Sequence, residues 1–309
     1  MSELTLKDRY LGCVIASAKS DFLGSAFEFK SRGSFHCTGP VLDGTGTWHL
    51  PPGAYTDDTS MALCLADSLI DCGFDAEDQL DRYCAWHDKG YRSSIGHCFD
   101  IGGTCSSALS RYRRDKSLLA PFSEWGAGNG SLMRLTPIPL YYRKYPAVAR
   151  KKAYLQSRVT HGAIVAADCC VFYTNLILGA LNGKSKEEIL APDFECLSSL
   201  EGKLSPKVEE IQKGSYQTKK LDEISSDGYS LHSLEAALYC FYHTDNLKDC
   251  VLMAVNLGSD TDTVACITGQ LAGAYYGIQA VPEEWPLMHL EMFQALTEKL
   301  LECSEDLIL

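Results

Sequence analysis

The sequence predicts an all-α protein, a compact helical bundle that forms a single domain over residues 1–309. Apolar residues recur at intervals of three and four along most of the chain, which is the period of an amphipathic helix. No segment has the convincing apolar and polar alternation of a β-strand. With 46% hydrophobic and 22% charged residues, the chain can bury the large core that such a bundle needs.

The first helices are predicted in the N-terminal third of the chain. A Gly- and Pro-containing stretch at residues 31–54 predicts a loop-rich connection between the first helix and the second. Each of the three helices shows apolar side chains at helical spacing. These residues are Leu11, Val14, Ile15, Ala18 and Phe22 in the first helix, Met61, Leu65 and Leu69 in the second, and Leu80, Cys84 and His87 in the third.

The later helices are separated by a second connection, residues 184–228, in which short helices can occur. Gly183 ends the helix before this connection. Small residues recur at intervals of three and four within residues 260–276, which predicts a central helix that a neighbouring helix approaches closely; they are Ala265, Gly269, Ala272 and Gly273. The predicted helices span residues 160–181, 231–242, 247–255, 260–276 and 282–301.

Charge and hydropathy exclude some functions. A net charge of −12 disfavours binding to nucleic acid, because neutralising phosphates requires clustered Lys and Arg. No apolar run is expected to reach the length that spans a membrane, and residues 1–8 lack the basic start and apolar core of a signal peptide. We therefore expect a soluble, cytoplasmic protein without a membrane partner, and a monomer.

The chain has 14 cysteines but no C-x-x-C pair. Cys64, Cys84, Cys240 and Cys266 lie inside apolar helical patterns, where a thiol acts as a small hydrophobic side chain. We interpret the cysteines as reduced thiols, not as disulfides or zinc ligands.

Two similar acidic clusters stand at predicted helix starts. They are Thr56-Asp57-Asp58-Thr59 and Asp260-Thr261-Asp262-Thr263. Asp and Thr at a helix start commonly cap free N–H groups and complement the helix dipole. Capping needs only one such residue, however, and several carboxylates brought together are unfavourable unless a cation lies between them. Spacing alone leaves both the capping and the metal-binding interpretations open.

Motifs found in order from about Asp8 to Gly277 resemble the ADP-ribosylglycohydrolase family. Each motif is modest alone, but the ordered set is specific, and it is most similar to the bacterial branch that removes ADP-ribose from arginine of dinitrogenase reductase. The motifs are Phe27-Glu28-Phe29, Thr56-Asp57-Asp58-Thr59, Gly128-Asn129-Gly130-Ser131-Leu132-Met133-Arg134, Thr160-His161-Gly162 and Gly258-Ser259-Asp260-Thr261-Asp262-Thr263.

The resemblance implies an all-helical fold with a cleft that holds two divalent cations. Oxygen ligands alone suit Mg²⁺ or Mn²⁺ better than zinc. Without the resemblance, Glu28 would be interpreted as a solvated acid at a helix end. Carried over by position, the implied metal ligands are Glu28, Thr56, Asp57, Asp58, Asp260, Asp262 and Thr263.

The resemblance also implies contacts with ADP-ribose. The small-residue loop at residues 126–131 opens a helix whose N–H groups and dipole could cradle the diphosphate, although a plain glycine-rich turn is commoner. His161 matches a contact to ADP-ribose, and Tyr229 matches the aromatic residue on which adenine stacks; alone, they would be a satisfied histidine and a half-buried tyrosine. The implied contacts are Gly126, Gly128, Asn129, Gly130, Ser131, Met133, His161 and Tyr229.

Two further acids match the family's cleft. Asp100 matches an acid that faces the scissile ribose, although it could instead cap a helix at Gly103, where relatives often carry Asn. Glu124 matches an acid that lines the cleft, and its alternative interpretation is a surface loop acid. The mechanistic hypothesis is that Asp100 or Glu28 handles protons.

The expected function is hydrolysis that removes ADP-ribose from a modified protein, with arginine as the acceptor. The expected partners are therefore ADP-ribose and an ADP-ribosylated protein. The alternatives keep the same site: ADP-ribosyl-serine, O-acyl-ADP-ribose or ADP-ribosylated nucleic acid as substrate, or a catalytically silent protein that only binds ADP-ribose.

Overall fold

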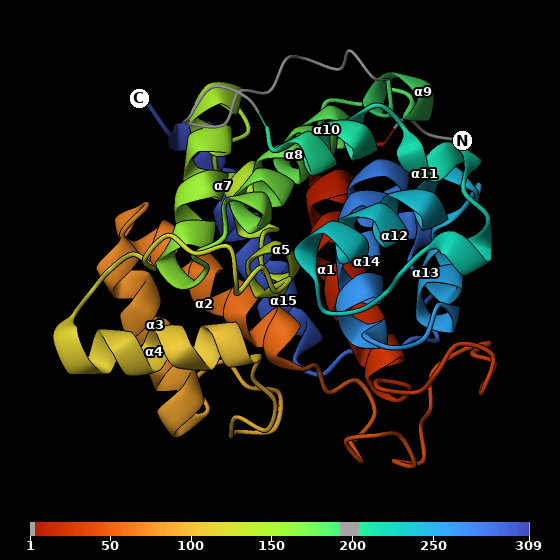
Figure 1. Cartoon of the computed structure of the whole chain (residues 1–309), viewed down its shortest axis with the longest axis horizontal. Coiled ribbons are helices and arrows are strands. Elements are labelled where there is room, and N and C mark those ends of the chain that lie inside the picture. Colours follow the sequence, from red (N-terminus) through yellow and green to blue (C-terminus); the bar gives the residue numbers. More distant parts are fainter. Residues whose placement is uncertain (1–3, 192–203, 309) are drawn as a thin grey trace.

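The computed structural model describes residues 4–191 and 204–308, and their regular structure is helical, as the sequence predicts (Figure 1). The β-type pairing within these residues is one isolated bridge between Gly128 and Tyr229. Two short 3-10 helices are η1 (Leu221–Glu223) and η2 (Ile278–Ala280). The α-helices are α1 (Leu6–Ser25), α2 (Asp57–Cys72), α3 (Ala76–Lys89), α4 (Gly103–Asp115), α5 (Gly130–Met133), α6 (Pro137–Tyr141), α7 (Pro146–Thr160), α8 (Ile164–Leu181), α9 (Lys186–Ile189), α10 (Pro206–Gln212), α11 (Ser215–Thr218), α12 (Ser230–Tyr242), α13 (Leu247–Asn256), α14 (Thr261–Tyr276) and α15 (Leu290–Asp306).

Helices α1 and α14 lie side by side, and glycines bring their backbones into contact (Figure 1). A Cβ atom added to Gly273 would lie 2.1 Å from the carbonyl oxygen of Gly12, and one added to Gly24 would lie 2.4 Å from that of Thr261. No side chain fits at such distances. The pairing is antiparallel, so the C-terminal end of α1 meets the N-terminal end of α14. The close-packed helix predicted at residues 260–276 is confirmed.

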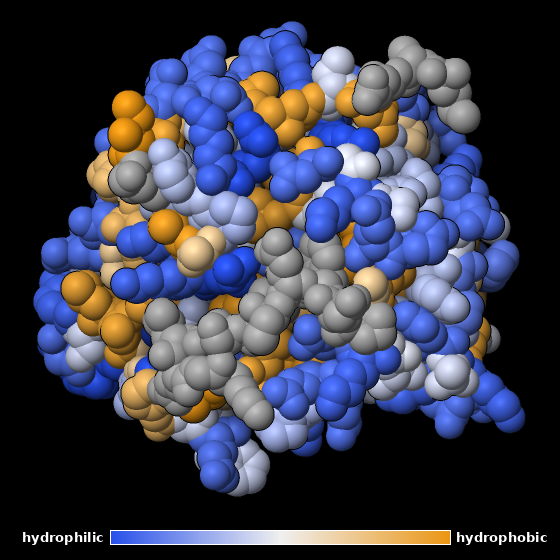
Figure 2. Space-filling model, turned by 90° about the horizontal axis from the view of Figure 1, so that it is seen from above, coloured by the Kyte–Doolittle hydropathy of each residue, from blue (hydrophilic) through white to orange (hydrophobic). Residues whose placement is uncertain are grey.

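Helix α8 corrects the expectation that no apolar run reaches membrane-spanning length. By length and composition alone, it could cross a membrane. In the structure, however, 89% of this segment is buried, and α8 packs against α7, α12 and α14. Figure 2 views the molecule from the side of α8 to α11, where mainly hydrophilic residues cover the surface and hydrophobic residues form separate groups. Helix α8 is therefore a core helix.

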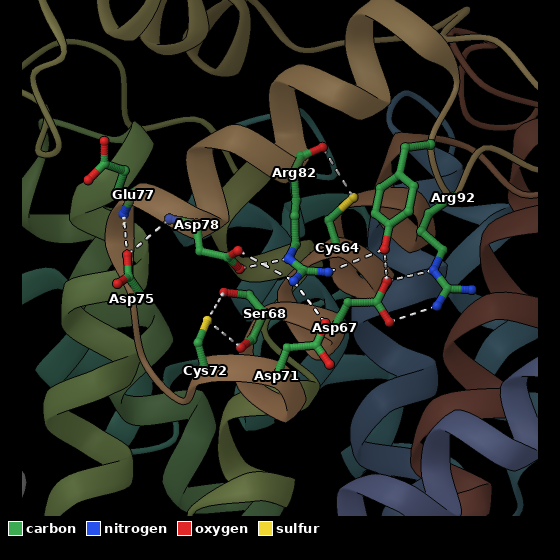
Figure 3. Close-up of polar contacts among 11 residues, drawn as sticks. Cys64, Asp67, Ser68, Asp71, Cys72, Asp75, Glu77, Asp78, Arg82 and Arg92 are labelled. Atoms are coloured by element: carbon green, nitrogen blue, oxygen red, sulfur yellow. Dashed lines mark hydrogen bonds and ion pairs between the residues drawn. The ribbon is translucent and has the colours of Figure 1, made fainter.

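Ion pairs join α2 to α3 and to the segment after α3 (Figure 3). Arg92 donates from Nε and Nη2 to the two carboxylate oxygens of Asp67, at 2.6 and 2.7 Å. Arg82 of α3 donates to Asp78 on its own helix and to Asp71 on α2. Because Asp67 is buried, its bidentate pairing is worth more than a surface contact and orients α2 within the bundle.

Two predicted helix boundaries are wrong. Residues 160–181 do not form one helix, because the chain leaves α7 at Thr160 and starts α8 only at Ile164. The last helix begins at Leu290 and ends at Asp306, and the residues before it, predicted as helical from 282, form turns. The apolar side chains in these non-helical stretches pack by tertiary contacts, and the helical period alone does not reveal this.

Helix α7 is not predicted by the apolar period, because small and polar side chains interrupt the apolar ones on the face that it buries. Its buried residues include Ala149, Ala153, Gln156 and Ser157. The connection at residues 31–54 contains no helix, and that at 184–228 contains α9, α10, α11 and η1, as expected, apart from residues 192–203, which lie outside the described part.

The cysteines in the described part of the chain are free thiols, as predicted. Cys64, Cys240 and Cys266 are buried in the helical core, and Cys84 is half-buried against it. Burial raises the pKa of the Cys64 thiol, which keeps it protonated and supports its interpretation as core filling.

Candidate active site

Three helix ends converge on a cluster of carboxylates. Glu28 lies just beyond the C-terminal end of α1, Asp57 and Asp58 lie in the first turn of α2, and Asp260 and Asp262 lie at the start of α14. The antiparallel packing of α1 and α14 places carboxylate oxygens of Glu28, Asp260 and Asp262 within 4.8 Å of one another. The fold thus gathers acids from both ends of the chain.

The acids at the start of α2 do not cap that helix, because Asp21 of α1 does so. Thr56 occupies the N-cap position but makes no capping hydrogen bond with its side chain. The Asp21 carboxylate accepts hydrogen bonds from the backbone N–H groups of Thr56 at 3.0 Å and Thr59 at 3.2 Å. The capping interpretation is therefore wrong for Asp57 and Asp58, which are left free for another role.

The carboxylate at the start of α14 is also not used as a cap. Asp260 is the N-cap residue but makes no capping hydrogen bond with its side chain. Its Oδ2 atom accepts a hydrogen bond from Nδ2 of Asn129 at 2.7 Å, and Asn129 also donates to the Ser233 hydroxyl at 2.9 Å. The amide of Asn129 therefore orients Asp260.

Asp58 joins the two clusters. Its Oδ2 atom lies 3.2 Å from the hydroxyl of Thr56 and 3.2 Å from that of Thr263. Its Oδ1 atom is buried and has no hydrogen-bond partner. A buried oxygen without a partner is unfavourable, and a cation at this point would satisfy it.

Burial and mutual repulsion raise the pKa of the clustered acids. Burial, reinforced by the charge of Asp100, raises the pKa of Glu28 to about 8. Burial, reinforced by Asp260, raises the pKa of Asp100 to about 6. Burial is again the first cause of a pKa well above its usual value at Asp57, Asp58 and Asp262. Carboxylates in this position need a nearby positive charge to be ionised together.

The predicted metal ligands fit divalent cations. Their donor atoms are carboxylate and hydroxyl oxygens, which Mg²⁺ and Mn²⁺ prefer. The acids are buried together, Asp57, Asp58 and Asp260 are not used as helix caps, and Asp58 has an unpartnered oxygen. The structure brings together all the predicted ligands, which are Glu28, Thr56, Asp57, Asp58, Asp260, Asp262 and Thr263.

The acids open into a cleft of about 470 Å³ whose wall includes Asp100 and the N-terminal end of α4. The N-cap residue of α4 is Gly102, so Asp100 does not occupy the capping position of this helix. The alternative that Asp100 caps this helix is therefore wrong. Its carboxyl group instead lies in the cleft wall with Glu28 and Asp57.

His161 lies buried in the wall of the same cleft, and its neighbours fix its protonation. Arg134, which can only donate, donates from Nη2 to Oγ1 of Thr160 at 2.7 Å. The Thr160 hydroxyl lies 2.8 Å from Nδ1 of His161 and can donate its own hydrogen to that nitrogen. Burial, reinforced by Arg134, lowers the pKa of His161 to about 3, so the ring is neutral. In the tautomer that accepts this hydrogen bond at Nδ1, the ring proton is on Nε2, a buried atom without a protein partner on a residue that lines the cleft.

The chain matches the ADP-ribosylglycohydrolase family model over residues 2–308. It belongs to this family. Proteins named ADP-ribosylarginine hydrolase Tri1 are similar to it: that of Pseudomonas putida (strain GB-1) is 38% identical over 90% of this chain and 73% of its own length, and that of Serratia proteamaculans (strain 568) is 37% identical over 95% and 79%.

More distant relatives and a solved structure agree with this assignment. ADP-ribosyl-[dinitrogen reductase] glycohydrolase of Rhodospirillum rubrum is 28% identical over 94% of this chain and 93% of its own length. A structure described as an ADP-ribosylglycohydrolase-related protein complex matches with a TM-score of 0.83 and 37% identity, over 97% of this chain and 99% of that one. The predicted family and its all-helical fold are confirmed.

In this ADP-ribosylglycohydrolase, part of the glycine-rich loop faces the cleft. Gly128, Asn129, Gly130 and Met133 line it. A Cβ atom at Gly130 would lie 2.9 Å from Sγ of Cys105, so a side chain there would disturb the wall. The helix that this loop opens, α5, has only four residues, which corrects the expectation of a useful helix dipole. The longer helix α4 also has its N-terminal end at the cleft.

Ser131 and Gly126 lie outside the lining of this cleft, contrary to the expected contacts. The Ser131 hydroxyl is buried 2.8 Å from that of Ser157, so it joins α5 to α7. Gly126 has a positive φ of 79° and lies near Thr104. Neither Gly126 nor Ser131 places a polar side-chain group in this cleft. The loop therefore contributes to the cleft mainly through its backbone.

A second cavity of about 730 Å³ contains the two remaining predicted residues, Tyr229 and Glu124. Tyr229 is half-buried in its wall and directly follows Gly228, which lines the acidic cleft, so the two cavities adjoin. Glu124 is exposed and lies at this second cavity, so it does not join the acid cluster.

Asp21 and Trp48 belong to the site but are not predicted by the sequence. Asp21 is one polar residue within the apolar pattern of α1, and no motif marks it. Trp48 lies in the loop-rich connection and donates from Nε1 to Oε2 of Glu28. Only the unusual presence of a polar or aromatic side chain in these segments could have drawn attention to them.

Proposed function

We propose that this ADP-ribosylglycohydrolase cleaves the N-glycosidic bond between ADP-ribose and an arginine side chain of a modified protein, with two divalent cations, Mg²⁺ or Mn²⁺, at the acid cluster. One observation carries the proposal: the acids at the starts of α2 and α14 are buried together, and Asp57, Asp58 and Asp260 are not used as helix caps. Relatives at 37–38% identity that carry the name ADP-ribosylarginine hydrolase support the choice of acceptor.

The arrangement of the two cavities suits one extended ligand. Tyr229 offers a ring for adenine in the second cavity. The backbone at Gly128 and Gly130 and the Nε2–H group of His161 lie in the adjoining cleft and offer donors to a diphosphate. The ribose would then lie over the acids, with its C1 atom facing Asp100.

Cleavage at C1 develops positive charge on the anomeric carbon, and the leaving guanidino nitrogen requires a proton. Bound divalent cations would orient the ribose hydroxyls and lower the pKa of a nearby water. The carboxylates of this chain stabilise the charge at C1. Asp100, with a pKa of about 6, can hold and release a proton near neutral pH, and Glu28 is the second candidate for this role.

The test is a panel of ADP-ribose conjugates linked through arginine, serine, an O-acyl ester and a nucleic-acid base, each assayed with chelator, with Mg²⁺ and with Mn²⁺. We expect cleavage of the arginine conjugate only when a cation is present. Faster cleavage of another conjugate would reassign the acceptor. Full activity in chelator would contradict the role of the cations, and ADP-ribose binding without cleavage of any conjugate would identify a silent binder.

A further inference from the structure

Phe29 has features that its contribution to stability does not explain. Its side chain is 69% exposed, so the phenyl ring gains little from burial. Its φ is 65°, in the left-handed region that an aromatic residue rarely adopts. The backbone is held there by a hydrogen bond from the N–H of Phe29 to the carbonyl of Ser259, at 2.7 Å, and Ser259 also has a φ of 65°. An unfavourable backbone that presents an exposed ring points to a function.

Phe29 is the first member of a row of aromatic rings beside the two candidate proton-transfer acids. The ring centroids of Phe29 and Trp48 are 6.1 Å apart at an interplanar angle of 67°, and those of Trp48 and Phe99 are 5.7 Å apart at 60°. Phe29 directly follows Glu28 in the chain, and Phe99 directly precedes Asp100. Trp48 lies between the two rings and donates its N–H to Glu28.

The row lies where the acceptor part of the substrate must leave the cleft. Phe29, Glu28 and Asp100 line the acidic cleft together. The nucleotide part is directed toward the other cavity, which begins at Gly228 and Tyr229. A conjugate with its diphosphate at that side and its C1 atom at the acids therefore extends its acceptor past the aromatic rings.

We propose that Phe29, Trp48 and Phe99 form an acceptor subsite that binds the guanidinium group of ADP-ribosyl-arginine. This proposal rests on the function proposed above. A guanidinium is planar, charged and weakly hydrated, so it stacks on aromatic faces and is attracted to their π-electrons. The carboxylates of Glu28 and Asp100 lie beside the rings and complement its charge. A seryl acceptor offers neither a charge nor a planar group, and an ester is planar but uncharged, so the subsite discriminates mainly by the positive charge of the guanidinium.

The test uses Phe29→Gly and Phe29→Ala. Both remove the ring, but glycine also accepts the positive φ, so Phe29→Gly should unfold at the same temperature as the parent or higher. We expect kcat/KM for an ADP-ribosyl-arginine peptide to fall about fivefold to thirtyfold in both variants, mainly through KM. The dissociation constant of free ADP-ribose and the kcat/KM for an O-acyl-ADP-ribose should stay at the parent values.

Tyr242→Ala is the matched control, because it removes a ring that is 41% exposed on α12 and lies outside both cavities. It should leave every rate unchanged. Parent-like kcat/KM for the arginine peptide in both Phe29 variants would overturn the acceptor subsite while leaving the proposed function intact, and so would an equal loss for the ester. Failure of the parent itself to cleave the arginine peptide would overturn both proposals.

Discussion

Asp21 of α1 binds Thr59 of α2 twice, accepting hydrogen bonds from its hydroxyl at 2.5 Å and from its backbone N–H at 3.2 Å. A cap for α2 thus comes from a different helix. This arrangement allows Asp57 and Asp58 to occupy the first turn without being needed as caps, and it couples the α1–α2 contact to the geometry of the acid cluster.

Asp21→Ala should lower the free energy of unfolding by roughly 1–3 kcal/mol, because the first turn of α2 loses its cap and buried donors lose their acceptor. Asp57 or Asp58 would then turn toward the free N–H groups, so Mn²⁺ affinity should fall. Chemical denaturation and calorimetric titration with Mn²⁺ measure the two effects. Asp21→Asn keeps an acceptor and should lose less of both. Unchanged Mn²⁺ affinity in Asp21→Ala would show that the cap and the acid cluster are independent.

Asp262→Asn should make the cation-free protein more stable and the enzyme less active. It removes one charge from a buried set of like charges and keeps an oxygen that can accept the N–H of Thr263. In chelator, the midpoint of thermal unfolding should rise by about 2–4 °C. Mn²⁺ affinity and hydrolysis should each fall more than about tenfold.

Cys64→Ala is the control for the Asp262 variant, since its thiol is buried in the core away from the cleft lining. It should lower the unfolding midpoint and leave hydrolysis unchanged. If Asp262→Asn instead lost its helical circular dichroism along with its activity, Asp262 would be a structural residue and not a cation ligand.

Stability without cations should fall as the pH rises. A carboxyl group whose pKa is higher in the folded protein than in the unfolded chain stabilises the fold at low pH, and this contribution is lost as the pH rises through the folded value. With pKa values of about 6 at Asp100 and about 8 at Glu28, the unfolding midpoint in chelator should decline between about pH 5 and pH 8. Saturating Mn²⁺ should reduce the decline, because the bound cation then neutralises the carboxylates that protons neutralise at low pH. A midpoint in chelator that rises over this range would contradict the raised pKa values.

Thr160→Val should weaken ADP-ribose binding without removing any group from the cleft wall. The variant keeps the shape of Thr160 but cannot donate to Nδ1 of His161, so the proton on Nε2 is no longer fixed. We expect the dissociation constant of ADP-ribose to rise about tenfold, and ¹⁵N chemical shifts of the imidazole to report a changed tautomer population. Thr160→Ser restores the hydroxyl, so it should restore both the dissociation constant of ADP-ribose and the tautomer population. A parent-like tautomer population in Thr160→Val would contradict the hydrogen bond from the Thr160 hydroxyl to Nδ1 of His161.

The sequence predicts the helices whose buried faces are apolar. The patterns of α1, α12 and α13 come from large apolar side chains in the core, and that of α14 comes from the small residues that let α1 approach closely. The period fails for α7, because buried small and polar side chains such as Ala153, Gln156 and Ser157 interrupt the apolar stripe to which Tyr154 and Val159 belong. It also fails at residues 282–289, where tertiary contacts hold a non-helical segment.

The acidic clusters and the glycine-rich motif are local patterns, so the sequence by itself determined which residues are candidates for the site and which family the chain resembles. It could not determine what those residues do, because capping and cation binding use the same residue types at the same helix starts. Tertiary structure excluded capping for Asp57 and Asp58, because the packing of α1 supplies Asp21 as the cap of α2. Likewise, Phe29, Trp48 and Phe99 become one surface only in the fold, because residues far apart in the chain leave no joint pattern in the sequence.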